Sequence, residues 1–261
     1  RLLIIYILAS YLSVEHYGTY SFLIALILFS SSLGNFGIEY SNTYYISNSQ
    51  SEYSKLVSMS ILFSLFSGMI LFLLVLLCWL LIEQPFTDID FYLILATSLC
   101  IPLLLNKKLF NGIFVGLQNF KLYGLNNLLE WLLLLLFLII LVLLHALSIS
   151  SVMIFYLLSL FISNLIIIFL LIRIKPVTFS FSSSALYELI RYGYKVYFKN
   201  IFESMALRLD YFIIKYYLSS SVLGVYSIAV QSAEFLIYLP SAISLILFPK
   251  IASLEDEKSY K

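Results

Sequence analysis

The sequence predicts an all-α polytopic membrane protein, on the strength of its composition, its apolar runs and the placement of its basic residues. Hydrophobic residues make up 62% of the 261 residues and charged residues only 11%, whereas a soluble domain is about half apolar and a quarter charged. Apolar runs recur at about 20 residues, the length that a helix needs to cross a bilayer core of about 30 Å. Lys and Arg fall in alternate connections between these runs, as in multi-pass membrane proteins.

The apolar runs predict about eight transmembrane helices. The first run, residues 2–12, is short, and we expect it to be clipped in a chain that is a fragment. The others cover residues 18–45, 56–82, 91–117, 125–145, 150–173, 196–218 and 222–249. The fourth run has two possible ends. It either continues to Leu117 or stops near Asn106, in which case the stretch KKLFNGIFVGLQNFK forms an interfacial helix.

Basic residues predict the orientation of the chain in the membrane. The connections after the first, third, fifth and seventh runs carry no Lys or Arg, and the connection IEQPFTDID is purely acidic. The opposite connections carry Lys55, Lys121, Arg173, Lys175, Arg191, Lys195, Lys250, Lys258 and Lys261. Because short cytoplasmic loops are enriched in Lys and Arg, we expect the N-terminus and the even-numbered helix ends to be cytoplasmic.

A short repeat predicts how the helices are organised into lobes. YLSVEHYGTYS at residues 11–21 and YLSSSVLGVYS at residues 217–227 share six of eleven positions, and they follow the first and the seventh run. Between them, residues 176–195 contain a Pro, a Ser-rich stretch and an amphipathic segment, which are typical of a linker. We therefore expect a six-helix lobe over residues 1–175, a cytoplasmic linker over 176–195, and the first two helices of a second lobe over 196–261. Parallel repeats of this kind, about an axis along the membrane normal, are a frequent transporter plan.

The seventh run contains ionisable residues, which are costly in a bilayer and normally face a bundle interior or a watery cavity. Lys199, Glu203 and Asp210 fall within about 40° of one another on a helix, and Arg208 lies near mid-depth. One interpretation is mutual neutralisation, with Lys199 paired to Glu203 and Arg208 paired to an acid on a neighbouring helix. The other is a cavity in which Arg208 holds an anion and Asp210 carries a proton or a cation.

Polar residues form narrow stripes on the second and eighth runs. The stripes comprise Ser21, Ser32, Asn35, Glu39 and Asn42 on one helix, and Ser227, Gln231, Glu234, Tyr238 and Ser241 on the other. Hydrogen bonds between helices account for the hydroxyl and amide groups. They do not account for ionisable groups, so Glu39 and Glu234 favour the lining of a cavity.

Two adjacent lysines, Lys107 and Lys108, have a role that depends on where the fourth helix ends. If the helix runs to Leu117, both lie inside the membrane and must face a cavity. If it ends near Asn106, both are interfacial lysines whose stems lie along the apolar surface. Glu130, near the start of the fifth helix, is expected to pair with a lysine of the fourth.

Several classes of function lack support in the sequence. There is no Walker motif and no metal-ligand spacing, and Cys78 and Cys100 lie in apolar runs as packing residues. The net charge of +1 argues against a nucleic-acid partner. We therefore expect a transporter among membrane lipids, with no enzymatic activity, metal or cofactor.

Four stretches resemble a known family. They are YGTYSF, LGNFGIEY, GLQNFKLYGLNNLLE and RLDYFIIKYYLSSSVLGVYSIAVQSAEFLIYLPSAISLILFPKIA. Together they resemble the Wzx-type O-antigen and capsule flippases of the multidrug, oligosaccharidyl-lipid and polysaccharide exporter superfamily. The resemblance implies two six-helix lobes around a central cavity in the bacterial inner membrane. It also implies the transfer of undecaprenyl-pyrophosphate-linked oligosaccharide from the inner to the outer leaflet by alternating access.

The resemblance also implies roles for individual residues and candidate partners. The expected pyrophosphate and sugar contacts are Arg208, Lys199, Lys107, Lys108, Gln231 and Asn35. The expected groups that couple transport to H⁺ or Na⁺ are Asp210, Glu234, Glu39 and Glu203. Polysaccharide polymerase and chain-length proteins are candidate partners.

Three alternatives remain at this point. A drug or cation exporter of the same superfamily would share the fold and favour acids and aromatics in its cavity. A membrane-embedded glycosyltransferase or polymerase would need a large outward loop, and the outward loops here are short. An assembly partner without transport of its own is the third.

Overall fold

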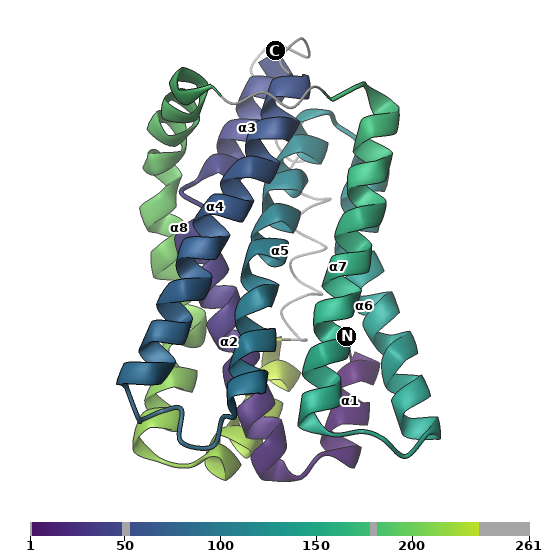
Figure 1. Ribbon diagram of the computed structural model, residues 1–261, viewed down its shortest axis with the longest axis vertical. Coiled ribbons are helices and arrows are strands. Elements are labelled where there is room, and N and C mark those ends of the chain that lie inside the picture. Colours follow the sequence, from purple (N-terminus) through teal and green to yellow (C-terminus); the bar gives the residue numbers. More distant parts are fainter. Residues whose placement is uncertain (1, 49–52, 178–181, 235–261) are drawn as a thin grey trace, which may run out of the picture.

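The computed structural model describes residues 2–48, 53–177 and 182–234, which form α-helices joined by short connections (Figure 1). The helices are α1 (Leu2–Tyr11), α2 (Val14–Gly34), α3 (Ile38–Asn48), α4 (Tyr53–Leu81), α5 (Phe91–Gly116), α6 (Phe120–Leu143), α7 (Ile149–Ile174) and α8 (Ser183–Tyr217). A further helix covers residues 220–234, and the rest of the predicted run 222–249 lies outside the described residues. The described residues contain no strand, so the predicted all-α fold is confirmed.

Five of the described helices, α2, α4, α5, α6 and α7, are long and apolar enough to cross a membrane. Helix α1 has only 10 residues, and α8, with 35 residues, carries charged side chains along its whole length. Several apolar helices in one bundle indicate a multi-pass membrane protein, as predicted.

Helix α5 occupies the centre of the bundle, with α2, α3, α4, α6 and α7 packed around it (Figure 1). Its packing against α4 is close because Gly68 of α4 faces Pro102 of α5. A Cβ atom at Gly68 would lie 2.5 Å from the Cα atom of Pro102. The helix continues to Gly116, which decides between the two predicted ends of the fourth run in favour of the longer helix.

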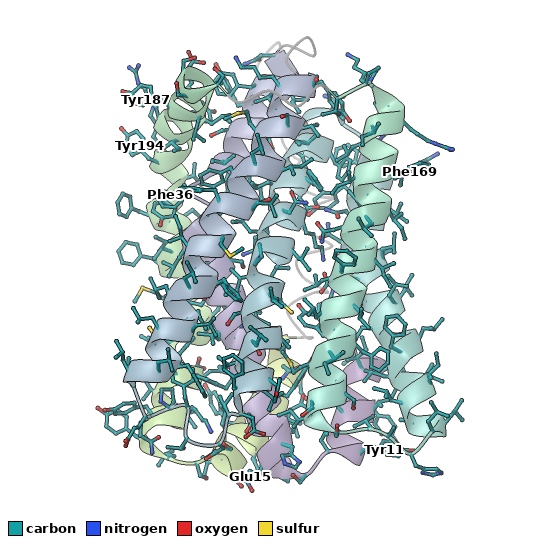
Figure 2. All side chains as sticks on the ribbon, in the orientation of Figure 1. Tyr11, Glu15, Phe36, Phe169, Tyr187 and Tyr194 are labelled. Carbon is teal, nitrogen blue, oxygen red and sulfur yellow. The ribbon has the colours of Figure 1, made fainter. Side chains whose placement is uncertain are left out.

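The outer surface of the bundle is apolar. Phe66 on α4, Leu132 on α6 and Phe169 on α7 are all exposed, and Phe169 points away from the helices (Figure 2). In a lipid environment such side chains meet a solvent as apolar as themselves. Tyr11 and Tyr187 lie near opposite ends of the bundle (Figure 2), where aromatic side chains suit the two membrane interfaces.

The prediction of one helix over residues 18–45 is wrong, because the chain breaks between α2 and α3. Phe36 and Gly37 adopt φ angles of 47° and 72°. Gly37 approaches Gly193 of α8 so closely that a Cβ atom would overlap the Gly193 carbonyl group. The Asn35 Oδ1 atom accepts a hydrogen bond from the Glu39 backbone N–H at 3.3 Å, and so caps the first turn of α3.

The amphipathic segment of the predicted linker and the seventh run form one helix, α8, whose first turn is capped by the Ser182 side chain. Helix α8 lies beside α2 and α3 (Figure 1). The Tyr197 hydroxyl donates to the Leu33 carbonyl at 2.9 Å, and the Ser41 hydroxyl donates to the Leu189 carbonyl at 2.6 Å. These bonds hold α8 against the junction between α2 and α3.

The two copies of the sequence repeat form the same local structure. Ser13 and Ser219 each accept a hydrogen bond from the backbone N–H three residues later, at 3.2 Å and 3.3 Å. Each copy is therefore a turn that ends in a capped helix, α2 in one case and the 220–234 helix in the other. The two helices meet where Ser21 donates to Ser227 at 2.9 Å, and these residues are 206 positions apart, like the repeats themselves.

Glycines of the two copies make reciprocal contacts. A Cβ atom at Gly18 would overlap the Ser220 carbonyl oxygen, and a Cβ atom at Gly224 would overlap the Val14 carbonyl oxygen. Val14 and Gly18 match Ser220 and Gly224 in the repeat, so each residue contacts its partner's counterpart. Such reciprocity is what a two-fold axis between the copies would produce. We call this contact, made by Val14, Gly18, Ser21, Ser220, Gly224 and Ser227, the glycine seam.

Candidate functional site

A cavity of about 290 Å³ lies where α2, α3, α5 and α8 meet. Its lining is largely polar, although the surrounding helices are apolar. The polar lining residues are Ser32, Asn35, Glu39, Tyr40, Lys108, Asn200, Glu203, Ser204 and Arg208. The volume far exceeds the roughly 10–15 Å³ that one buried water requires, so the cavity can hold water and a polar ligand group.

A smaller cavity of about 40 Å³ adjoins the first and lies between α1, α2, α6, α8 and the 220–234 helix. Leu28 and Arg208 line both cavities, so they form the wall between them. Gln231 and Tyr211 line the smaller one. The buried Tyr211 hydroxyl has no hydrogen-bond partner among the described residues, and this cavity has room for water that could serve as one.

Arg208 and Glu234 form a two-point ion pair. The Arg208 Nη1 atom lies 2.8 Å from Glu234 Oε1, and Nη2 lies 3.4 Å from Oε2. The side chains are 13% and 20% exposed, so neither is fully buried. The Arg208 Cζ atom also lies 5.4 Å from the centre of the Tyr211 ring. The expectation that Arg208 pairs with an acid on a neighbouring helix is confirmed, and the same residue lines both cavities.

Lys108 and Glu39 face the larger cavity from α5 and α3. The Lys108 ammonium donates to the Ser32 hydroxyl at 3.0 Å, and Glu39 Oε2 accepts from the Asn35 side-chain amide at 3.1 Å. Asn35, predicted as a sugar contact, thus both lines the cavity and fixes the Glu39 carboxylate. No ion pair forms between Lys108 and Glu39 within 4.0 Å among the described residues.

Lys107 lies apart from both cavities, in contrast to its neighbour. Its ammonium forms an ion pair with the Glu130 carboxylate of α6, and both side chains are buried. The predicted pairing of Glu130 with a lysine of the fourth helix is confirmed. The expected contact of Lys107 with a pyrophosphate finds no support in this geometry, because its charge is already neutralised inside the helix bundle.

The remaining predicted residues divide between the surface and the helix interface. Lys199 is 71% exposed and lies 3.5 Å from Glu203, so the predicted pairing of these two residues is confirmed. Glu203 lines the larger cavity, whereas Lys199 does not. Asp210 lines neither cavity and accepts hydrogen bonds from the Tyr226 hydroxyl at 2.5 Å and the Tyr211 backbone N–H at 2.9 Å.

Asn200 and Ser204, which were not predicted as site residues, line the larger cavity from α8. A polar cluster at the far end of α8 was not predicted either. There the Lys215 ammonium donates to Asp88 at 2.6 Å and to Ser220, and Ser220 donates to Asp88 at 2.7 Å. The hydrogen bond from Lys215 lowers the pKa of Asp88 from 3.8 to about 2, and that from Ser220 adds to the effect. The signal in the sequence was a purely acidic loop and a single lysine at the end of the seventh run.

Comparison with known proteins identifies the family of this chain. The profile of a family described as "Polysaccharide biosynthesis protein" matches residues 7–261, nearly the whole chain. No curated protein and no solved structure matches the chain. A multi-pass bundle with a polar cavity suits a membrane step in the handling of polysaccharides. The chain belongs to the polysaccharide biosynthesis protein family.

Proposed function

We propose that this chain works in a transporter that moves a lipid-linked oligosaccharide, joined to its lipid through a diphosphate, across the membrane by alternating access. The observation that carries the proposal is the pair of cations, Lys108 and Arg208, that reach one cavity from two different helices. A diphosphate needs such cations, because it must leave water on entering the protein. The sugar needs the amide and hydroxyl groups beside them, and the lipid tail can stay in the surrounding bilayer.

The direction of transport in this proposal is from the inner to the outer leaflet of a bacterial inner membrane. It is supported by the alternation of basic residues along the sequence, which favours a cytoplasmic N-terminus. The energy would come from H⁺ or Na⁺ moving with the cycle. Glu39 and Glu234 are the strongest candidates for that ion, because one lines the cavity and the other holds Arg208. Glu203 and Asp210 are weaker candidates, since each has a partner outside the cavity.

The same lining suits a phosphate-bearing substrate better than an organic cation. A cation exporter would be served by acids alone, whereas this lining places Lys108 and Arg208 beside the acids. Export to a polysaccharide polymerase and chain-length proteins would complete the pathway outside the membrane.

A complementation experiment tests the proposal. Cells of a strain that lacks its own polysaccharide flippase express the complete protein or a variant, and surface polysaccharide and intracellular lipid-linked oligosaccharide are both measured. Lys108→Gln should lower surface polysaccharide at least about tenfold, with oligosaccharide accumulating inside, because one buried cation–phosphate contact is worth more than about 1.4 kcal/mol.

Arg208→Gln is combined with Glu234→Gln, so that no carboxylate is left unpaired, and is compared with Glu234→Gln alone. The matched control is Lys199→Gln, which removes the same charge from an exposed position and should leave export unchanged. Export at the unaltered level in both the Lys108 variant and the Arg208 double variant would refute the proposal.

A further inference from the structure

Arg208 lines a cavity suited to an anion, but its guanidinium is already paired with the carboxylate of Glu234. Its guanidinium donates to both oxygens of Glu234 at 2.8 Å and 3.4 Å. A guanidinium fork has the same geometry toward a carboxylate and a phosphate. A diphosphate that enters the larger cavity therefore meets donors that Glu234 occupies.

The charges around the larger cavity make this competition costly unless a proton or cation enters too. Lys108 and Arg208 contribute two positive charges to the lining, and Glu39 and Glu203 contribute two negative ones. Glu234 adds a further negative charge at Arg208. Among the described residues, the walls thus hold no excess positive charge with which to meet an added anion.

Among the described residues, Glu234 forms an ion pair with no cation other than Arg208. Arg208 is the sole charged residue that lines the smaller cavity within the described part of the chain; the polar groups beside it are neutral, such as Tyr211 and Gln231. The nearest acid on α8, Asp210, is bound to Tyr226 of the 220–234 helix. Separation from Arg208 would leave this partly buried carboxylate as an uncompensated charge, which a proton can neutralise.

We infer that the lipid diphosphate and the Glu234 carboxylate compete for Arg208, so that each diphosphate that binds is accompanied by the uptake of a proton at Glu234. The proton comes from water, which can reach the Glu234 side chain because that side chain is 20% exposed. By linkage, the same competition weakens diphosphate binding as the pH rises, and return of Arg208 to Glu234 expels the proton. This inference rests on the proposed function, because it assumes a diphosphate ligand in the larger cavity.

Calorimetry with the complete protein in lipid nanodiscs tests it, with geranylgeranyl diphosphate as the probe. The binding heat is measured at one pH in two buffers of different ionisation enthalpy, which gives the number of protons taken up. We expect an uptake of about one proton per probe in the unaltered protein. Glu234→Gln should bind about tenfold more tightly, because the competing charge is gone, and should take up no proton.

The matched control is Glu203→Gln, which removes the same charge from the larger cavity but from a carboxylate whose partner is Lys199. It should keep the proton uptake. If Glu234→Gln also keeps the proton uptake or binds more weakly than the unaltered protein, the inference is overturned while the proposed function stands. If the unaltered protein does not bind the probe at all, the proposed function fails as well.

Discussion

Replacement of Gly18 by Ala should separate the two helices that begin at the repeated turns. The Cβ atom would overlap the Ser220 carbonyl oxygen and lie 2.8 Å from the Gly224 nitrogen. Both are backbone atoms, so no side-chain rotation can relieve the overlap. A carbon–oxygen contact needs about 3.3–3.6 Å, and the 220–234 helix must therefore move by about 1 Å or more.

The magnitude follows from two opposed effects. Overpacking of a close contact costs about 1–3 kcal/mol, and a shift of backbone belongs to the upper part of that range. Alanine gains about 1 kcal/mol over glycine in helix propensity. We expect a net loss of about 1–2 kcal/mol in the free energy of unfolding for Gly18→Ala. Gly224→Ala should lose a similar amount, because its contact with Val14 mirrors that of Gly18 with Ser220.

The assay is reversible unfolding in mixed detergent micelles, followed by circular dichroism, with Gly124→Ala as the control. Gly124 is a helical glycine in α6 with nothing within 4 Å of its Cβ position, so alanine there should stabilise the protein by up to about 1 kcal/mol. The double variant Gly18→Ala/Gly224→Ala should lose less than the sum of the single losses, because one separation relieves both overlaps. If Gly18→Ala proves as stable as Gly124→Ala, the two helices do not approach each other closely at the glycine seam.

Two further predictions concern ion pairs away from the cavity. Glu130→Gln should destabilise the protein by about 3–5 kcal/mol, because it leaves the Lys107 ammonium buried without a partner. In the same unfolding assay, the double variant Lys107→Met/Glu130→Leu should recover most of that loss. Equal stability of the two variants would contradict this account. The pKa of Asp88 is lowered to about 2 by Lys215, so Asp88 stabilises the fold above about pH 4, and that stabilisation should vanish as the pH falls toward 2. Unfolding of Asp88→Asn and of the unaltered protein across this range should show their difference shrink with acidity, and a constant difference would contradict the assignment.

The extent of the helices was largely predictable because hydropathy depends on composition within a window. The break at Phe36 and Gly37 was not, since apolar residues continue on either side of it. What sets the break is the approach of Gly37 to Gly193, more than 150 residues later. A local pattern holds no information on such a distant contact.

The site was predictable as a set of unusual residues, but their pairing was not. Lys107 and Lys108 are adjacent in sequence and about 100° apart on their helix. One turns toward α6 and meets Glu130, whereas the other faces the larger cavity and meets Ser32. The partner of Arg208 was foreseen only as an acid on a neighbouring helix, and the structure names it as Glu234.

Composition and residue identities are enough to show that this protein is a helical membrane protein and that one turn occurs twice, because neither depends on how the chain folds. The folded structure was needed to show that the two turns lie against each other, with Ser21 hydrogen-bonded to Ser227, and to show which cations line a cavity. The partner of a buried charge, and the backbone that a glycine allows to approach, both depend on which helices pack together. Both are supplied by packing between helices far apart along the chain.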